Sequence, residues 1–553
     1  MPREETGGWE ASTRVVVWGA ATALAALGCL TAGAHLWAWW SGAPAPTWNP
    51  LDLAVGLAVG TVPATTAMWA WVAAVAVLAA LAAAAPALVR ARGYRQARRG
   101  DAAARLAGSR RDSAPLGRRA VAAKARRLGV DGAVGLPVGR RVDGGDPVLS
   151  SFEDVATVIA GPRTGKTTSW VVPRILAAPG VVVATSNKRD VLDVTRADRA
   201  DAGPVWVFDP QGIADEPQRF WWDPLGQVTD AVSADALAQV LADATREPGS
   251  TGSAFFDNAA RELVASLLLA AARARRPVTV VHRWLTDQGD DEAVQILRDA
   301  GDTVSAETLQ GLLNLVPETR SGVVGGAAQL VGFMRNTRAM LWVTPAPGVP
   351  ELRPEELVAA GGGTLYCLSQ EGQGSVSAIV TALTVAVTRA ALDHAKTRPS
   401  GRLPVPMLIE LDEAANICKW SELPAQYSHF GSRGICVDTV LQSWSQGTRV
   451  WGDAGMSALW SASNVKVYAG GVTEARFLSD LSTLIGEHWV DSVQVTSSAT
   501  GSSTSRGRAA QARQIATAAD LMALPAGRAW VLASGCRPVL ARLVPYWQNK
   551  GKK

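Results

Sequence analysis

A short stretch of small and polar residues at 160–168 has the composition and spacing of an anion-binding loop. It reads Ala-Gly-Pro-Arg-Thr-Gly-Lys-Thr-Thr, and it follows apolar residues that predict a buried strand. Glycine lets the backbone turn tightly enough for successive N–H groups to point inward. A helix predicted to start here would add its positive dipole end. Strand, loop and helix in this order indicate a site for nucleotide phosphates. The alternative is that Gly-Lys-Thr occurs here by chance in a surface turn, but such a turn would not require this order of elements.

The pattern is that of the phosphate loop, G-x-x-x-x-G-K-[ST], except that Ala160 stands where the first glycine is usual. In such a loop Lys166 can reach the β- and γ-phosphates and the Thr167 hydroxyl can ligate Mg²⁺. The sequence therefore predicts ATP and Mg²⁺ as ligands. The residues expected to contact them are Gly161, Pro162, Arg163, Thr164, Gly165, Lys166, Thr167 and Thr168.

Two acidic residues follow a second apolar run, at 405–411. We expect Asp412 to hold the Mg²⁺ shell and Glu413 to polarise the attacking water. An acidic pair after a strand is common by itself, but it gains meaning beside a phosphate loop. A neighbouring strand predicted at 435–441 ends at Gln442, which we interpret as a γ-phosphate sensor or water-orienting group. The alternative for Gln442 is a helix-capping role.

Apolar runs alternate with helical patterns along the rest of the chain, which predicts an α/β fold with helices on both faces of a parallel sheet. Further strands are expected at 181–185, 205–208, 364–368, 464–468 and 529–533, with a long apolar helix at about 375–396. Between 228 and 336 helix-period positions dominate, and only Val278–Val281 has strand character. The Ser/Thr/Gly-rich segment 492–508 is predicted to be a mobile loop.

Two apolar runs near the amino terminus, 15–40 and 66–89, are long enough to cross a bilayer. Trp37, Trp39 and Trp40 would form an interfacial belt, and Pro63 marks a break before the second span. A cleaved signal peptide is the alternative for the first run, and a buried globular helix for the second. Five scattered cysteines without a C-x-x-C pair fit a reduced, cytosolic protein.

Positive charge is concentrated directly after the second run. Residues 90–127 hold thirteen Lys and Arg against two Asp, a net charge of +11, whereas the whole chain carries +5. Basic residues beside a membrane end stay cytoplasmic, so both termini and the nucleotide domain are expected in the cytoplasm of a multi-pass protein of the cell membrane. Contact with anionic lipid accounts for these residues, and DNA binding is the second interpretation.

These patterns divide the chain into five segments. We predict a two-helix transmembrane anchor at 1–90, a basic juxtamembrane linker at 91–130, the first part of the nucleotide-binding domain at 131–227, a mainly helical insertion at 228–345 and the second part of the domain at 346–553.

Two spans, the phosphate loop, the helical insertion, Leu-Asp-Glu-Ala-Ala-Asn at 411–416 and Val-Leu-Gln-Ser-Trp-Ser-Gln at 440–446 occur in this order. Over essentially its whole length the chain resembles the type IV coupling proteins of conjugation, the TraG/TraD-type ATPases related to FtsK. The resemblance implies a RecA/FtsK-like P-loop domain in a membrane-anchored, hexameric ring. It also implies recruitment of a relaxase bound to single-stranded DNA, and its transfer to a type IV secretion channel.

The resemblance assigns ATP·Mg²⁺ binding to Lys166 and Thr167, hydrolysis to Asp412 and Glu413, and a response to the γ-phosphate to Gln442. The helical insertion would help to dock relaxosome proteins. The family often carries Gly-Arg before the strand of the glutamine, offering an arginine to a neighbouring subunit. Here the stretch is Gly-Ser-Arg-Gly at 431–434, so Arg433 is the displaced candidate.

Two other functions are compatible with parts of this pattern. One is a double-stranded DNA translocase of the FtsK type, which usually carries a carboxyl-terminal winged-helix domain that is not predicted after Arg513. The other is a membrane scaffold with a regulatory nucleotide site. A degenerate site of that kind would be expected to lose at least one of Lys166, Thr167, Asp412 and Glu413, and all four are present.

Overall fold

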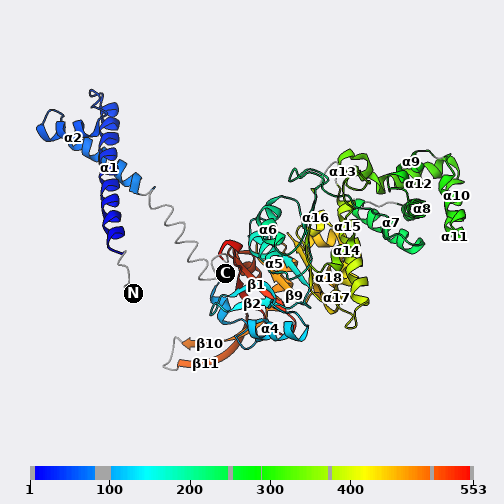
Figure 1. The fold of residues 1–553 in the computed structure, drawn as a ribbon. Helices are drawn as coiled ribbons and strands as arrows, with labels where there is room; N and C mark the ends of the chain where they lie inside the picture. Colours follow the sequence, from blue (N-terminus) through cyan, green and yellow to red (C-terminus); the bar gives the residue numbers. More distant parts are fainter. Residues whose placement is uncertain are drawn as a thin grey trace, which may run out of the picture. The chain divides into compact units, whose positions relative to one another are not determined.

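The computed structural model describes residues 7–80, 82, 101–246, 253–287, 289–370, 376–497 and 504–548. The chain divides into two compact units, Met1–Arg99 and Gly100–Lys553 (Figure 1). Each unit is described by itself below.

The first unit contains α1 (Gly7–Ser41), α2 (Pro50–Val59) and a helix at Thr66–Ala80. Asn49 caps α2, since its Oδ1 accepts the Leu51 N–H at 3.1 Å. The predicted break at Pro63 lies between α2 and the third helix. A Cβ on Gly33 would meet the Val72 backbone at 2.5 Å, so α1 and the third helix approach closely there. Of the predicted second span, 66–89, the structure describes residues 66–80 and 82, and the rest lies outside the described part of the chain.

The second unit is built on an eleven-stranded sheet of order β2-β1-β13-β12-β9-β3-β8-β7-β4-β6-β5, counted over the described residues. The run from β9 to β5 is parallel, and β12, β13, β1 and β2 extend it as an antiparallel edge. The strands are β1 (Leu136–Arg141), β2 (Pro147–Ser150), β3 (Ala156–Ile159), β4 (Val182–Ser186), β5 (Val205–Phe208), β6 (Thr364–Leu368), β7 (Met407–Leu411), β8 (Ile435–Leu441), β9 (Val465–Tyr468), β12 (Arg528–Ala533) and β13 (Val539–Arg542).

Helices cover both faces of this sheet, as predicted. Successive strand residues belong to different hydrophobic clusters: Val158 to one and Ile159 to the other. One cluster includes residues of α4 (Arg118–Arg127), α5 (Val172–Ala177) and α6 (Asp190–Ala200). The other includes α15 (Ser377–Lys396), α16 (Ala414–Ile417), α17 (Leu423–Phe430), α18 (Trp444–Ala462), α19 (Ala475–Ile485) and α20 (Ala518–Met522).

Among the described helices, α15 alone passes a test of length and apolarity for a membrane span. Of the apolar stretch of α15, 78% is buried. Its apolar character is therefore that of a core helix packed under the sheet.

A helical group is inserted between β5 and β6 (Figure 1). It consists of α7 (Ala231–Thr245), α8 (Ala254–Arg273), α9 (Val280–Thr286), α10 (Glu292–Asp299), α11 (Thr303–Leu313), α12 (Pro317–Leu330), α13 (Thr337–Leu341) and α14 (Pro354–Ala359). The strand character expected at Val278–Val281 is wrong, because α9 begins there. Val281, Trp284 and Leu285 of α9 are all buried, and their spacing of three and four residues places them on one helical face.

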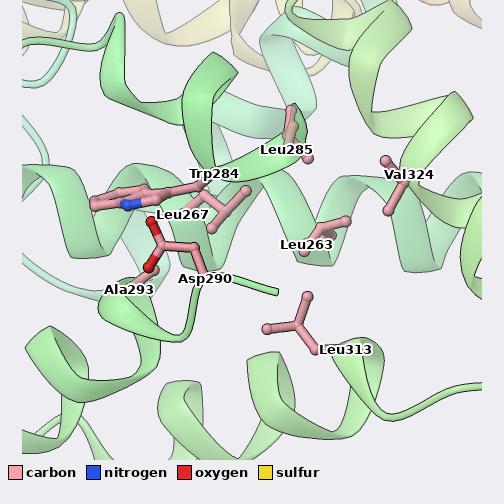
Figure 2. A pocket seen from close by; sticks show the side chains of 8 residues that line it. All are labelled: Leu263, Leu267, Trp284, Leu285, Asp290, Ala293, Leu313 and Val324. Atoms are coloured by element: carbon pink, nitrogen blue, oxygen red, sulfur yellow. The ribbon is translucent and has the colours of Figure 1, made fainter. Parts of the chain in front are cut away.

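The side chains that line the core of the insertion include Leu263, Trp284, Asp290 and Leu313 (Figure 2). They surround a cavity of about 10 Å³. A single water needs about that much space, so this cavity is a packing gap and not a ligand site.

The Ser/Thr/Gly-rich segment 492–508 is not simply a loop. Its described residues belong to β10 (Glu487–Ser497) and β11 (Thr504–Gln514), which pair in continuous antiparallel register from Glu487↔Gln514 to Ser497↔Thr504 (Figure 1). The sequence 487–497 places Val490, Val493 and Val495 among polar residues, and β-branched residues favour strands. Residues 498–503 lie outside the described part of the chain.

Folded structure begins before the predicted domain boundary at residue 131. Val121 and Ala125 of α4 are buried, while the arginines of the same helix face outward. Asp101 accepts two hydrogen bonds from Arg528 on β12, at 2.6 and 2.9 Å. The predicted basic linker is therefore a folded part of the second unit from residue 101 onward, because its apolar positions recur with a helical period that the arginine content conceals.

Candidate nucleotide site

The phosphate loop joins the carboxyl end of β3 to a π-helical turn, Thr167–Val171, that continues into α5. Gly165 has a φ of +88°, which a residue with a Cβ rarely adopts. Gly161 is needed for a different reason, since a Cβ there would lie 2.0 Å from the Gly471 carbonyl oxygen. Ala160 is buried and its N–H donates to the Leu441 carbonyl at 2.9 Å, so the departure from glycine costs no backbone strain.

The remaining loop residues have different surroundings. Thr164 is buried and its hydroxyl donates to the Gly161 carbonyl at 2.8 Å, which closes the loop on itself. Thr168 donates to the Gly165 carbonyl at 3.2 Å. Pro162 and Arg163 are exposed at the outer bend. Hydrogen bonds within the loop thus fix its conformation, while Pro162 and Arg163 on its outer side are exposed to solvent.

The two acidic residues lie at the carboxyl end of β7, which is separated from β3 only by β8. Lys166 Nζ donates to Asp412 Oδ1 at 3.1 Å and also forms a short ion pair with Glu413 Oε1. The Thr167 hydroxyl donates to Asp412 Oδ2 at 3.4 Å. The structure therefore brings together Lys166, Thr167, Asp412 and Glu413, four residues selected from two motifs almost 250 positions apart.

Burial controls the charges in this cluster. Desolvation raises the pKa of the Asp412 carboxyl, against the opposing attraction of Lys166. Desolvation acts to lower the pKa of Lys166, but the carboxylates of Asp412 and Glu413 outweigh it and the pKa is raised. Lys166 is therefore a firmly charged ammonium, the form that binds phosphate oxygens.

Glu413 is fixed by further side chains. Gln442 Nε2, at the carboxyl end of β8, lies 2.7 and 2.8 Å from its two carboxylate oxygens. Asn416 Nδ2 donates to Glu413 Oε2 at 3.4 Å. Glu413 itself has a φ of +56°, an uncommon left-handed conformation for a residue with a side chain. Strain at a residue held by several partners is typical of a site where orientation matters.

Arg433 does not join this group. It precedes β8 at the amino end of the strand, whereas the phosphate loop follows the carboxyl end of the parallel neighbour β3. The seven residues of β8 separate the two by roughly 20 Å. Arg433 Nη1 donates to the Gly401 carbonyl at 2.8 Å. It cannot act on the nucleotide of its own chain, and a role on a neighbouring subunit stays a prediction.

A segment that the motifs did not reveal forms one wall of the site. After β9 the chain passes through Gly470 and Gly471, both with positive φ. The Gly161 N–H donates to the Gly470 carbonyl at 2.9 Å, and the Ala469 N–H donates to Ile159 at 2.9 Å. A Gly-Gly pair two residues after the end of a predicted strand was the available signal, because such a pair permits close backbone approach.

A buried ion pair connects the helix that follows the phosphate loop to the sheet. Arg174 of α5 makes two hydrogen bonds to Asp438 of β8, one of them short and the other 2.8 Å, and both side chains have no exposed area. Glu410 of β7 lies in register beside Asp438. Burial, and then the charge of Asp438, raises the pKa of Glu410 well above its ordinary value. The pair therefore ties the helix after the phosphate loop to β8, the strand that ends at Gln442.

We predict that Arg174→Met destabilises the protein strongly, because it leaves Asp438 buried without its cation. Breaking a buried pair in this way typically costs about 3–5 kcal/mol. The matched control is Arg196→Met, which removes a partly exposed pair with Glu216 and should cost about 0–1 kcal/mol. Thermal melting of both variants, followed by circular dichroism, measures the difference, and equal melting temperatures would contradict it.

The residues present fit a nucleotide with Mg²⁺. A charged lysine and a glycine loop at a helix start suit the phosphates, and a threonine hydroxyl beside an aspartate carboxylate is a usual Mg²⁺ ligand set. Among the described residues there is no group of three or more His, Cys, Asp or Glu arranged to hold another metal.

Comparison with known proteins identifies the family. A family model described as "Type IV secretory system Conjugative DNA transfer" matches residues 121–331, and one described as "TraM recognition site of TraD and TraG" matches residues 406–526. No curated protein sequence matches significantly.

Similar solved structures include the bacterial conjugative coupling protein TrwBdeltaN70 in an unbound form, with 17% identity and a TM-score of 0.55 over 76% of this chain and 91% of that one. The plasmid coupling protein TrwB with ADP and Mg²⁺ matches at 16% identity and a TM-score of 0.56, over 76% and 91% of the two chains. TrwB with a non-hydrolysable ATP analogue gives the same identity and TM-score over 76% and 92%.

At such identities the structures show a shared α/β nucleotide-binding fold. The family models supply the identity, because one describes conjugative DNA transfer by the type IV secretory system, the other describes a part of TraD and TraG, and they match on either side of β6. The chain therefore belongs to the type IV coupling proteins of conjugation.

Proposed function

We propose that this chain is the ATPase that recruits a relaxase–DNA complex and passes it into a type IV secretion channel. The observation that carries the proposal is the convergence of Lys166, Asp412, Glu413 and Gln442 at one edge of the sheet. A scaffold with a regulatory site would need Lys166 and Asp412 for binding, but it has no use for a carboxylate held by three side chains.

The residues divide the work of hydrolysis. The loop N–H groups and Lys166 would bind the phosphates, while Thr167 and Asp412 would hold Mg²⁺, which neutralises phosphate charge when bound. Lys166 is the ion-pair partner of Glu413, so its engagement with phosphate would release that carboxylate. Glu413 would then accept a proton from the attacking water, with Gln442 keeping its orientation.

The decisive measurement is ATP hydrolysis by the purified full-length chain, alone and with single- or double-stranded DNA. Stimulation by single-stranded DNA supports the coupling function. Stimulation by duplex DNA alone would indicate an FtsK-type translocase instead, and ATP binding without turnover under any condition would indicate a regulatory site.

The proposed partners are the relaxosome, the secretion channel and further copies of the chain. We expect these copies to form a hexamer, which mass photometry of the detergent-solubilised protein would detect. The description of the second family model names TraM recognition over 406–526, and this range lies outside the helical insertion. We therefore place relaxosome docking on the second half of the nucleotide domain as well as on the insertion.

We also propose that the first unit is a membrane hairpin with both chain ends in the cytoplasm. The net charge of +11 at 90–127, beside the end of the second apolar run, supports this orientation, because basic residues at a membrane end stay cytoplasmic. A cysteine placed at Ser41 should react with a membrane-impermeant thiol reagent in intact cells, and one at Ser109 should not. Both positions are exposed, and native Cys29 and Cys536 require a background control. Labelling at Ser109 alone would invert the topology and remove ATP from reach of the site.

A further inference from the structure

The amino end of α18 is held by a carboxylate from a different part of the chain. Glu474 Oε2 accepts the Trp444 N–H and its Oε1 accepts the Ser445 N–H, both at 2.9 Å. These two amides are among the first in the helix and have no partner within it. A carboxylate on both is favoured by charge-assisted hydrogen bonds and by the helix dipole.

The start of α18 lies next to Glu413, the proposed general base. Gln442, whose side chain contacts both oxygens of Glu413, is only two residues before Trp444. The Gln442 N–H donates to Gln446 Oε1 at 2.8 Å, so its backbone is also tied to the first turn of α18. A shift of this turn would therefore move Gln442 against Glu413.

Glu474 is also connected to the phosphate loop. It ends the segment 469–474 between β9 and α19, and the same segment bonds to Gly161 through Gly470 and packs on it through Gly471. The chain thus forms a closed circuit of contacts from the phosphate loop, through Glu474, to Gln442 and Glu413.

Packing of α18 on α19 does not depend on Glu474. Trp444 stacks on Phe477 with ring centroids 5.3 Å apart, and Trp460 contacts both rings edge-on. This aromatic cluster keeps the two helices together, and Glu474 adds orientation at one end. Loss of the carboxylate should therefore leave the fold intact.

We propose that Glu474 is a positioning residue for ATP hydrolysis, which holds the first turn of α18 so that Gln442 keeps Glu413 in place. The inference rests on the proposed function, in which Glu413 is the base. It assigns a role in the reaction to a residue that belongs to neither nucleotide motif.

The test compares full-length Glu474→Gln with Asp480→Asn, since both carboxylates line the same groove between α18 and α19 but Asp480 is exposed. In Glu474→Gln an amide NH₂ faces one of the two backbone N–H groups. We expect kcat to fall about tenfold, within the roughly 10²-fold that a displacement of 1 Å can cost, while the KM for ATP stays within about twofold. Asp480→Asn should retain the original kcat, and Glu474→Asp should give an intermediate value.

The second measurement places Glu474→Gln in a Gln442→Ala background. If Glu474 acts through Gln442, the second substitution lowers kcat no further, an outcome that a general loss of stability would not produce. An additive loss, or an unchanged kcat in Glu474→Gln, would overturn the inference while the proposed function stands. If Glu474→Gln does not fold, Glu474→Asp in both backgrounds gives the same comparison. Absence of ATP hydrolysis by the unaltered chain would overturn both proposals together.

Discussion

Lys166→Ala should abolish measurable ATP hydrolysis. The substitution removes the one ammonium that the phosphate loop directs at the cluster of Asp412 and Glu413, and it leaves the loop backbone in place. Removing a single preorganised hydrogen-bond donor that stabilises developing negative charge commonly lowers kcat about 10²–10³-fold. Here the lysine would bind the oxygens of two phosphates at once. A phosphate-release assay on the purified protein measures the loss.

Lys396→Ala is the matched control for that prediction. Lys396 ends α15 on the surface, where it pairs with Asp393, so its removal should not alter turnover. If Lys166→Ala hydrolysed ATP at the original rate, the phosphate loop could not be the site of hydrolysis and the proposed function would lose its basis.

Glu413→Gln should bind ATP and hydrolyse it very slowly. The amide has nearly the shape of the carboxylate but cannot accept a proton from water, and general-base groups contribute about 10²–10⁴-fold. Gln442 would face an amide in place of a carboxylate and would lose one of its two acceptors. Nucleotide affinity, followed with a fluorescent ATP analogue, should fall little.

The control for this variant is Glu422→Gln, at the start of α17, where the carboxylate accepts a hydrogen bond from Gln426 of the same helix; this variant should hydrolyse ATP normally. A loss in Glu413→Gln of less than about tenfold, with ATP binding retained, would mean that another group accepts the proton.

Three strands, β5, β6 and β8, could be predicted to the residue, whereas β4, β7, β9 and β12 differ from their predicted bounds by one or two residues. β6 and β8 are buried along their whole length, and largely apolar runs without alternation are typical of parallel strands covered on both faces. The predictions failed where local composition and tertiary context disagree. Val278–Val281 is β-branched but packs as a helical turn, and the basic residues of 118–127 concealed an amphipathic helix.

The site shows the same division. The phosphate loop and the acidic pair are local patterns, and each was visible because its chemistry fixes residue types at short spacing. Glu474 is 29 and 30 positions from the amides it holds, and Arg174 is 264 positions from Asp438. Nothing in the sequence near either residue specifies its partner, since the fold alone brings them together.

The two hydrogen bonds between Asp101 and Arg528 have a mechanical consequence. A motor that pulls DNA must transmit the recoil to whatever holds it, and in this chain the proposed anchor connects to the second unit at residue 100. Tension would enter at Asp101 and pass through Arg528 into β12, then across the ladder to β9 and to β3, which carries the phosphate loop. Two strand-to-strand steps thus separate the point of traction from the phosphate loop, so load on the tether would be transmitted to the proposed site of ATP hydrolysis.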